Sequence, residues 1–388
     1  MGDEAGGDSV HECLNKIIAK SAFCMVPTTT PCSTSTENTE SAQLNFSISE
    51  TKKMKPSHWW DGTPLPNDKD NDDTTNETPP PLFTEWIWPP STVPYYRTAY
   101  KRNAKCFTSH PHGRCYQSLY HQLERALELP KSVQGSKDEV GCDHPFHRMI
   151  PSFFHTLVEL QKRKWSYTLV LRTFGSDLQD VVQAIQDFAR GKHPLFPDFR
   201  DSTLAEWDTT KLYRGRWRMP QNGMKESSGN PVDQDFDAVY DLYPSHSHND
   251  QNNPIATGDR EVLSIIENCK VCGIQDDYAH WDKNNNAPWA GKPVWIRKKN
   301  KQNASSFCHQ IFFDDNIHND PTDSIVSVRL ERSCDEDGIR KAEIGPFKSL
   351  SGVEIIEMQG KHLIRVPTIC AIQERDWFIQ RIESAISY

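Results

Sequence analysis

The sequence predicts an α/β protein with a mostly parallel sheet, helices on both faces of that sheet and long irregular insertions. Two apolar runs are typical of buried strands, and each ends in polar residues of the kind found at functional sites. In an open parallel sheet, the functional crevice lies outside the carboxyl ends of the strands. A mean hydropathy of −0.71 and 26 prolines in 388 residues indicate that much of the chain lies outside a core. One main domain with insertions therefore fits better than two or three compact domains.

The first apolar run extends from Tyr167 to Thr173 and closes on a hydroxyl residue. The turn sequence Phe-Gly-Ser-Asp follows at residues 174–177. A helical pattern then continues through Val181, Val182, Ile185 and Phe188. A strand, a threonine, a glycine turn and a helix together form one half of a phosphate site, because the helix begins where the strand presents its hydroxyl group.

The second apolar run places two adjacent acids at the end of a strand. Residues 307–316 read Phe-Cys-His-Gln-Ile-Phe-Phe-Asp-Asp-Asn, so Asp314 and Asp315 close the run. Carboxylates held at a strand end can bind Mg²⁺. A second adjacent pair, Asp276 and Asp277, follows the run at residues 271–275, which is less apolar and contains a glycine. We therefore rank this pair below Asp314 and Asp315 as metal ligands.

The composition of the chain changes along its length. We expect an N-terminal helix in residues 1–25, where Val10 to Phe23 is amphipathic. Residues 26–82 predict a largely disordered linker with an ordered, tryptophan-rich patch. Residues 83–148 predict an irregular, cap-like segment, and residues 149–388 the core, with an insertion at 195–258. The tryptophan and proline segments at 58–65 and 86–96 predict ordered coil that packs on the core.

The remaining elements follow from apolar spacing. Helices are predicted at residues 118–129, 153–160, 261–269 and 350–358, and strands at 324–329 and 362–368. Asp376 is placed to cap a C-terminal helix. The strand at 324–329 is expected as the next βα step after the acid-pair strand.

The pattern made by Thr173, Lys292, Asp314 and Asp315 resembles the haloacid-dehalogenase-like (HAD) superfamily of Mg²⁺-dependent phosphotransferases. In that family a Ser or Thr ends one strand, a Lys or Arg comes shortly before the fourth motif, and the fourth motif is an acid pair that ends another strand. Thr173 matches the second motif, and Asp314 with Asp315 the fourth. Lys292 is the best match to the third, and Lys298, Lys299 and Lys301 compete for that role. The resemblance spans about residues 150–330 and implies a Rossmann-like sheet, Mg²⁺ as the cofactor and a phosphorylated small molecule as the substrate.

The family's first motif, Asp-x-Asp at the end of the first strand, has no credible copy before Thr173. Residues 70–74 fit the letters Asp-x-Asp-x-Thr, but the proline and polar residues before them cannot form a strand. Residues 44–51 alternate like a strand, yet both acid positions are Ser, which cannot form an aspartyl-phosphate. We expect that Met1 is an internal start and that the nucleophile strand lies upstream. The alternative is a divergent member that has lost the motif.

Two functions from different classes follow from the resemblance. One is a HAD-like phosphohydrolase represented by an N-truncated sequence, inactive as given because the nucleophile is missing. The other is a non-catalytic HAD-like binding or scaffold protein. In either case Thr173 and Lys292 are expected to hold phosphate, and Asp314 and Asp315 to hold the metal.

Charge and cysteine content limit the partners. A net charge of −9 and a pI near 5.9 argue against a general nucleic-acid binder, because neutralising phosphates needs a basic face. No run of about 18 apolar residues is present, so we expect no membrane partner. Eleven cysteines without a secretory signal predict reduced thiols and a cytoplasmic, intracellular protein.

Zinc is the alternative metal. Cys106, His110, His112 and Cys115 are residue types that bind Zn²⁺, but their spacing matches no standard module. The Cys-x-x-Cys at 269–272 is predicted to fall across a helix end, with one thiol in the core, so a redox role is less favoured.

Overall fold

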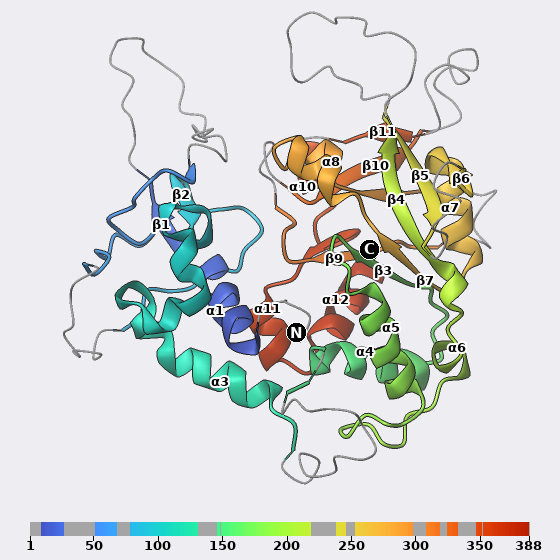
Figure 1. Cartoon of the computed structure of the whole chain (residues 1–388), viewed down its shortest axis with the longest axis horizontal. Coiled ribbons are helices and arrows are strands. Elements are labelled where there is room, and N and C mark those ends of the chain that lie inside the picture. The colour runs from blue at the N-terminus through green and yellow to red at the C-terminus, as the bar shows by residue number, and fades with distance from the viewer. Residues whose placement is uncertain are drawn as a thin grey trace, which may run out of the picture. The chain divides into compact units, whose positions relative to one another are not determined.

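The computed structural model describes residues 9–26, 51–67, 78–130, 146–147, 149–218, 238–245, 253–297, 308–318, 324–332, 347–350 and 352–387. The chain divides into two compact units, residues 1–153 with 366–377 and residues 154–365 with 378–388. Each unit is treated separately below. Helices and strands are both abundant, and some strand pairs are parallel, so the predicted mixed α/β class is confirmed at this level (Figure 1).

The first unit is mainly helical. It contains α1 (Val10–Ser21), β1 (Phe23–Met25), β2 (Thr92–Pro94), α3 (Gln117–Leu127) and α11 (Thr368–Gln373), with 3-10 turns at Tyr95–Arg97, Ala99–Ser109 and Pro111–Tyr116. Helix α1 begins as the amphipathic pattern predicts. Ser9 and Glu12 cap it reciprocally, so two backbone N–H groups at the helix start are bonded to side chains.

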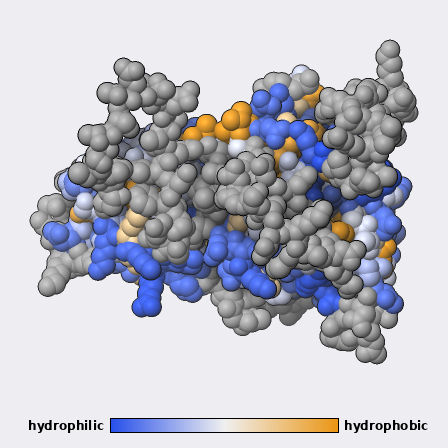
Figure 2. Space-filling view, turned by 90° about the horizontal axis from the view of Figure 1, so that it is seen from above, coloured by the Kyte–Doolittle hydropathy of each residue, from blue (hydrophilic) through white to orange (hydrophobic). Residues whose placement is uncertain are grey.

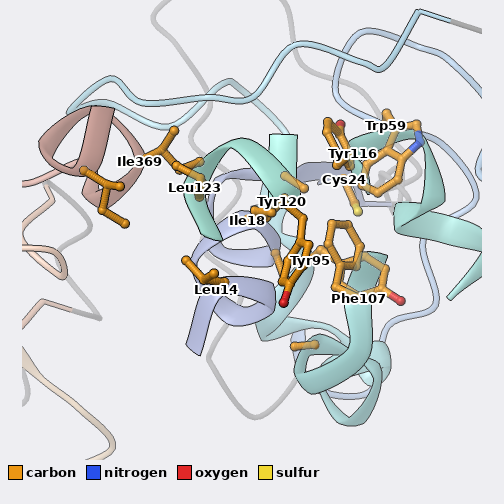
Figure 3. Close-up of a cluster of buried hydrophobic side chains, with 14 of the residues drawn as sticks. Leu14, Ile18, Cys24, Trp59, Tyr95, Phe107, Tyr116, Tyr120, Leu123 and Ile369 are labelled. Atoms are coloured by element: carbon orange, nitrogen blue, oxygen red, sulfur yellow. The ribbon is translucent and has the colours of Figure 1, made fainter. Parts of the chain in front are cut away.

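Aromatic and aliphatic side chains from distant segments form the core of this unit (Figure 3). Leu14 and Ile18 of α1 are fully buried, and so are Trp59, Tyr95 and Phe107. Rings of this size each bury a large apolar area, so they stabilise a unit that has little sheet. The expectation that the tryptophan-rich patch is ordered therefore holds for Trp59.

One part of that expectation is wrong. We predicted only coil at residues 86–96, but Thr92–Pro94 is β2, which pairs antiparallel with β1 from Phe23 opposite Pro94 to Met25 opposite Thr92. The pairing is compatible with proline because β2 has one strand neighbour among the described residues, so the missing proline N–H can face away from the ladder.

The second unit contains the strand that ends at Thr173 and most of the described strands. Its elements are α4 (Pro151–Lys162, whose first three residues belong to the first unit), β3 (Leu169–Thr173), α5 (Leu178–Ala189), α6 (Ser202–Ala205), β4 (Leu212–Arg218), β5 (Val239–Pro244), β6 (Ala256–Thr257), α7 (Gly258–Asn268), β7 (Val271–Gln275), α8 (Tyr278–Lys283), β8 (Lys292–Ile296), β9 (Phe312–Asp314), β10 (Val326–Glu331), β11 (Phe347–Ser349), α10 (Val353–Ile356), β12 (Leu363–Arg365) and, from its second residue, α12 (Trp377–Ile386). Short 3-10 turns lie at Thr209–Lys211 and Pro288–Ala290.

The largest sheet has the strand order β3-β7-β4-β5-β6. Strand β7 is parallel to both β3 and β4, whereas β4–β5 and β5–β6 are antiparallel. One face of β7 presents Gly273 to Leu178 of α5. The other face presents Cys272 and Ile274 to a cluster that contains α7 residues and Trp295 of β8. A helix therefore packs on each face of β7, but with two parallel and two antiparallel pairs the sheet is mixed and not mostly parallel as expected.

The prediction of one sheet that holds both motif strands needs correction. Strand β9, which carries the acid pair, pairs in parallel with β12 in a separate two-stranded sheet. Strand β8 pairs in parallel with β10, and β10 antiparallel with β11. Within the described ranges, β3 and β9 therefore share no ladder. Alternating apolar residues predict a strand but do not select its neighbour, which depends on hydrogen bonds to distant segments.

Residues 195–258 were expected to form an insertion. Instead they supply β4, β5 and β6 to the five-stranded sheet, and β4 lies directly beside β7. Trp217 and Tyr240 from this stretch are buried in the same cluster as Trp295. The polar stretches that suggested an insertion are residues 221–234 and 245–253, and apart from Ser245 and Asn253 they lie outside the described residues.

Most of the surface coloured in Figure 2 is hydrophilic, with small hydrophobic areas between. The large apolar or aromatic residues that are exposed lie singly along the chain: Met25, Ile87, Leu195, Ile255, Tyr278, Val353 and Ile386. In the part of the chain that the structure describes, no helix has both the length and the apolar character needed to cross a membrane.

Candidate functional site

The turn after β3 is held by its own side chains. The Thr173 hydroxyl accepts a hydrogen bond from the Gly175 N–H at 2.9 Å and donates to Asp177 Oδ1 at 3.1 Å. The Gln275 amide, at the end of β7, donates to the Gly175 carbonyl at 3.0 Å. A Cβ on Gly175 would lie 2.8 Å from Asp177 Oδ1, so a larger residue here would have to displace the Asp177 carboxylate. The carboxyl ends of β3 and β7 are thus fixed together.

Two predicted site residues meet beside this turn. Lys292 Nζ donates to Asp314 Oδ2 at 2.8 Å, and their side chains are only 5% and 10% exposed. The same ammonium lies 3.5 Å from the Arg172 carbonyl oxygen, at the position before Thr173. It also lies 5.1 Å from the centre of the Phe174 ring. The third-motif and fourth-motif candidates therefore converge at the end of β3, although β3 and β9 lie in different sheets.

The two acids of the predicted pair have different partners. Asp314 Oδ1 accepts the backbone N–H of Asn316 at 2.9 Å, while its other oxygen accepts from Lys292. Asp315 Oδ1 accepts the side-chain amide of Asn316 at 3.1 Å. Lys292 therefore supplies a protein cation to one acid of the pair, and the amide of Asn316 contacts the other.

The lower-ranked acids have structural roles. Asp276, 2% exposed, accepts two hydrogen bonds from the Arg172 guanidinium, one of them from Nε at 2.8 Å, and a third from the Tyr240 hydroxyl. Asp277 caps α8 by accepting the His280 N–H at 3.1 Å, and it also accepts the Trp217 N–H at 3.2 Å. Asp276 thus accepts three side-chain hydrogen bonds in a buried network, and Asp277 accepts one backbone hydrogen bond on each oxygen.

The buried network around Asp276 perturbs its neighbours. Burial alone would lower the pKa of Arg172, but the Asp276 carboxylate reverses this effect and raises the pKa above its usual value. Burial, together with the same carboxylate, raises the pKa of Tyr240 well above its usual value. The arrangement is therefore a charged arginine and carboxylate pair with a neutral tyrosine donor. A third guanidinium bond, from Arg172 Nη1 to the Pro293 carbonyl at 3.0 Å, joins β3 to β8.

Sequence reasoning missed Arg172 and Tyr240. The available signal for Arg172 was a cation at the penultimate position of an otherwise apolar strand, because a buried charge requires a partner. Tyr240 carried no comparable signal. Its role depends on Gly215, where a Cβ would overlap the tyrosine hydroxyl.

The remaining candidates from the sequence either fall outside the described residues or have other hydrogen-bond partners. Lys298, Lys299 and Lys301 fall outside the described residues, and so do residues 44–50 and 70–74. Among described residues no group of three or more His, Cys, Asp or Glu side chains is placed to hold a metal ion. The proposed zinc ligands have other partners: His112 Nδ1 lies 2.9 Å from the Tyr95 hydroxyl, and His110 Nε2 lies 3.1 Å from Asn103 Nδ2. A zinc site at residues 106–115 is therefore not supported.

The cysteine pair at 269–272 is buried. Burial, followed by the influence of Cys269, raises the pKa of the Cys272 thiol to about 12. A thiol in that state is a poor nucleophile, so the geometry gives no support to a redox role.

Comparison of the whole chain with protein-family models, with curated proteins and with solved structures finds no match.

Proposed function

We propose that the site at the carboxyl ends of β3 and β7 in the second unit binds a phosphate ester together with Mg²⁺, in a HAD-like manner. The observation that supports this most is the buried pair of Lys292 Nζ and Asp314 Oδ2, 2.8 Å apart, beside the carbonyl oxygen of Arg172. Residues expected to hold phosphate and metal are 22 positions apart in sequence and still meet at one strand end. The proposal includes a Rossmann-like, HAD-like sheet as the fold of the second unit.

Lys292 has the chemistry to hold phosphate. An ammonium group carries three N–H donors. One donates to Asp314 and a second points to Arg172 at the long distance of 3.5 Å, so donor capacity remains for a phosphate oxygen. The side chain is 5% exposed, so a phosphate bound here would meet the charge with little screening by water.

Thr173 acts mainly by positioning. Its hydroxyl already bonds Gly175 and Asp177, which keeps the turn at residues 173–177 compact beside Lys292. Helix α5 begins immediately after this turn, and it has no side-chain cap on its first N–H groups. Those groups favour an anion at the start of α5.

Asp314 and Asp315 are compatible with Mg²⁺. This ion is usually held by one or two carboxylates, with waters and phosphate oxygens completing the coordination, so a group of three protein ligands is unnecessary. Each Asp314 oxygen accepts one hydrogen bond from the protein and keeps a further lone pair. When bound, Mg²⁺ would neutralise charge on the phosphate.

The proposal concerns binding rather than turnover. Hydrolysis through an aspartyl-phosphate needs an attacking carboxylate, and none of the described strands ends in Asp-x-Asp. Asp276 and Asp277, the lower-ranked acids from the sequence, accept hydrogen bonds from Arg172, Tyr240 and the start of α8. This favours the second function class, a non-catalytic HAD-like binding protein, for the residues described.

Calorimetry with inorganic phosphate, with and without Mg²⁺, tests the proposal. Wild type should bind phosphate more tightly with Mg²⁺. The double variant Lys292→Met/Asp314→Leu removes both charges but keeps the buried volume, so it should fold and lose binding. The matched control is Lys348→Met/Glu354→Leu, which removes an ion pair of 2.7 Å that is 39% and 47% exposed.

Equal phosphate binding by wild type and by the Lys292/Asp314 double variant would contradict the proposal. A phosphatase assay on the same proteins separates the two function classes. We expect no phosphate release. Mg²⁺-dependent release that Asp314→Asn abolishes would show that the chain is an enzyme whose nucleophile we have not identified.

A further inference from the structure

Three aromatic side chains lie beside the proposed phosphate position and have no role in it. Phe174 follows Thr173 directly, and Tyr278 and Trp281 belong to α8. The Phe174 and Trp281 rings are stacked, with centres 5.1 Å apart and planes at 26°. Tyr278 meets Phe174 edge to face at 5.8 Å. We call Phe174, Tyr278 and Trp281 the aromatic group.

The protein holds the aromatic group rigidly. The Trp281 indole N–H donates to the Ser324 carbonyl at 3.0 Å. Asp277 caps α8 and also bonds Trp217 of β4, so the helix that carries Tyr278 is anchored to the sheet. The Phe174 ring packs between the Trp281 ring and the Lys292 ammonium. A side chain that is already held in place loses little freedom when a ligand ring packs on it.

Tyr278 is nevertheless 51% exposed, one of the few large hydrophobic side chains in the described residues that water reaches so freely. An exposed aromatic ring gains free energy when another flat ring covers it. The cap of α8 and the anchoring of Trp281 do not involve the Tyr278 ring, so its exposed face is not needed for either.

Distance connects the aromatic group with the phosphate position. Lys292 Nζ lies 5.1 Å from the Phe174 ring centre, and Phe174 lies 5.8 Å from Tyr278. The Tyr278 ring is therefore no farther from the ammonium than these two separations added together. These two separations set an upper limit on the distance, and a sugar that joins a phosphate to a flat base can bridge a distance within that limit.

We propose that the ligand of this site is a nucleoside monophosphate, with its phosphate at Lys292 and its base stacked on Tyr278. The inference rests on the proposed function and specifies its ligand class. Stacking of a base on an aromatic side chain tolerates any base, so the geometry selects a nucleotide without selecting its base.

The test compares AMP with ribose 5-phosphate, which has the same phosphate and sugar but no base. By calorimetry with Mg²⁺, wild type should bind AMP about fivefold or more tightly than ribose 5-phosphate, as expected from base stacking. Tyr278→Ala should abolish this preference and leave the affinity for ribose 5-phosphate unchanged. Tyr278→Phe should retain the preference, because the ring is kept.

Val353→Ala is the control for loss of exposed apolar surface, since Val353 is 71% exposed on α10. It should behave as wild type. Equal affinities of wild type for AMP and ribose 5-phosphate, or a preference that survives in Tyr278→Ala, would overturn the inference while the phosphate site stands. Failure of both ligands and of inorganic phosphate to bind would instead overturn the proposed function, and the inference with it.

Discussion

The buried ion pair of Arg172 and Asp276 allows a quantitative test of how the second unit is held together. Asp276→Asn keeps the size of the side chain and removes its charge. Asp276 is 2% exposed and the Arg172 side chain 7%, so water cannot replace the lost carboxylate. Removing one partner of such a pair costs about 3–5 kcal/mol, because the remaining charge is buried without compensation. The folding equilibrium constant should fall by roughly two to three and a half orders of magnitude.

Two comparisons set the scale of this effect. Tyr240→Phe removes one hydrogen-bond donor to the carboxylate but leaves Arg172 in place, so it should cost about 1.5–3 kcal/mol. Lys348→Met removes one partner of an exposed ion pair and should cost about 1 kcal/mol or less. The order of the three variants follows directly from burial.

Hydrogen exchange is the suitable assay, because the chain has two compact units and its unfolding need not be two-state. Peptides that cover β3 and β7 report on the strands joined by the pair. A loss of protection in Asp276→Asn below about 1 kcal/mol would refute the reasoning. Loss of Mg²⁺ binding in this variant without loss of stability would show that Asp276 is a metal ligand and not a partner of Arg172.

Three further predictions follow from buried groups. Burial lowers the pKa of His147 to about 4, so between pH 6.5 and 4 the unfolded chain binds a proton that the folded chain does not. The free energy of unfolding of the first unit should therefore fall by up to about 3 kcal/mol as the pH drops from about 6.5 to 4. Urea unfolding should show this fall for wild type and no such fall for His147→Gln. Iodoacetamide at pH 8 should label the exposed Cys106 long before Cys272, because burial raises the pKa of the Cys272 thiol to about 12. Equal labelling rates by mass spectrometry would contradict the burial of Cys272. Gly215→Ala should displace the Tyr240 ring and destabilise β4 at least as much as Tyr240→Phe, and hydrogen exchange that finds a smaller effect would count against this packing.

Local patterns were sufficient for individual elements. The strand that closes on Thr173, the turn with Gly175 and the helix after it follow from apolar spacing and turn residues, and the structure has them as β3, a compact turn and α5. The same holds for α1, whose cap involves residues only three positions apart. These features depend on neighbours in sequence, so the sequence contains the information that decides them.

The assignment of strands to sheets could not be predicted in this way. β9 has the pattern of a buried strand, but its parallel partner is β12, about 50 residues later. Likewise, the polar stretches at 221–234 and 245–253 suggested an insertion, although β4 and β5 beside them belong to the main sheet. Pairing is decided by hydrogen bonds and packing between distant segments, and periodicity does not encode these.

The same division applies to the candidate site. The position at a strand end singled out Asp314, and the family resemblance singled out Lys292; the structure brings their side chains to 2.8 Å. The pattern of two adjacent acids could not distinguish a pair that faces Lys292 from one that is engaged by Arg172 and Tyr240. By itself the sequence determined which carboxylates stand at strand ends. Only the tertiary structure decided which of them is bonded to a buried guanidinium, because the charges that neutralise a buried acid come from strands far away in sequence.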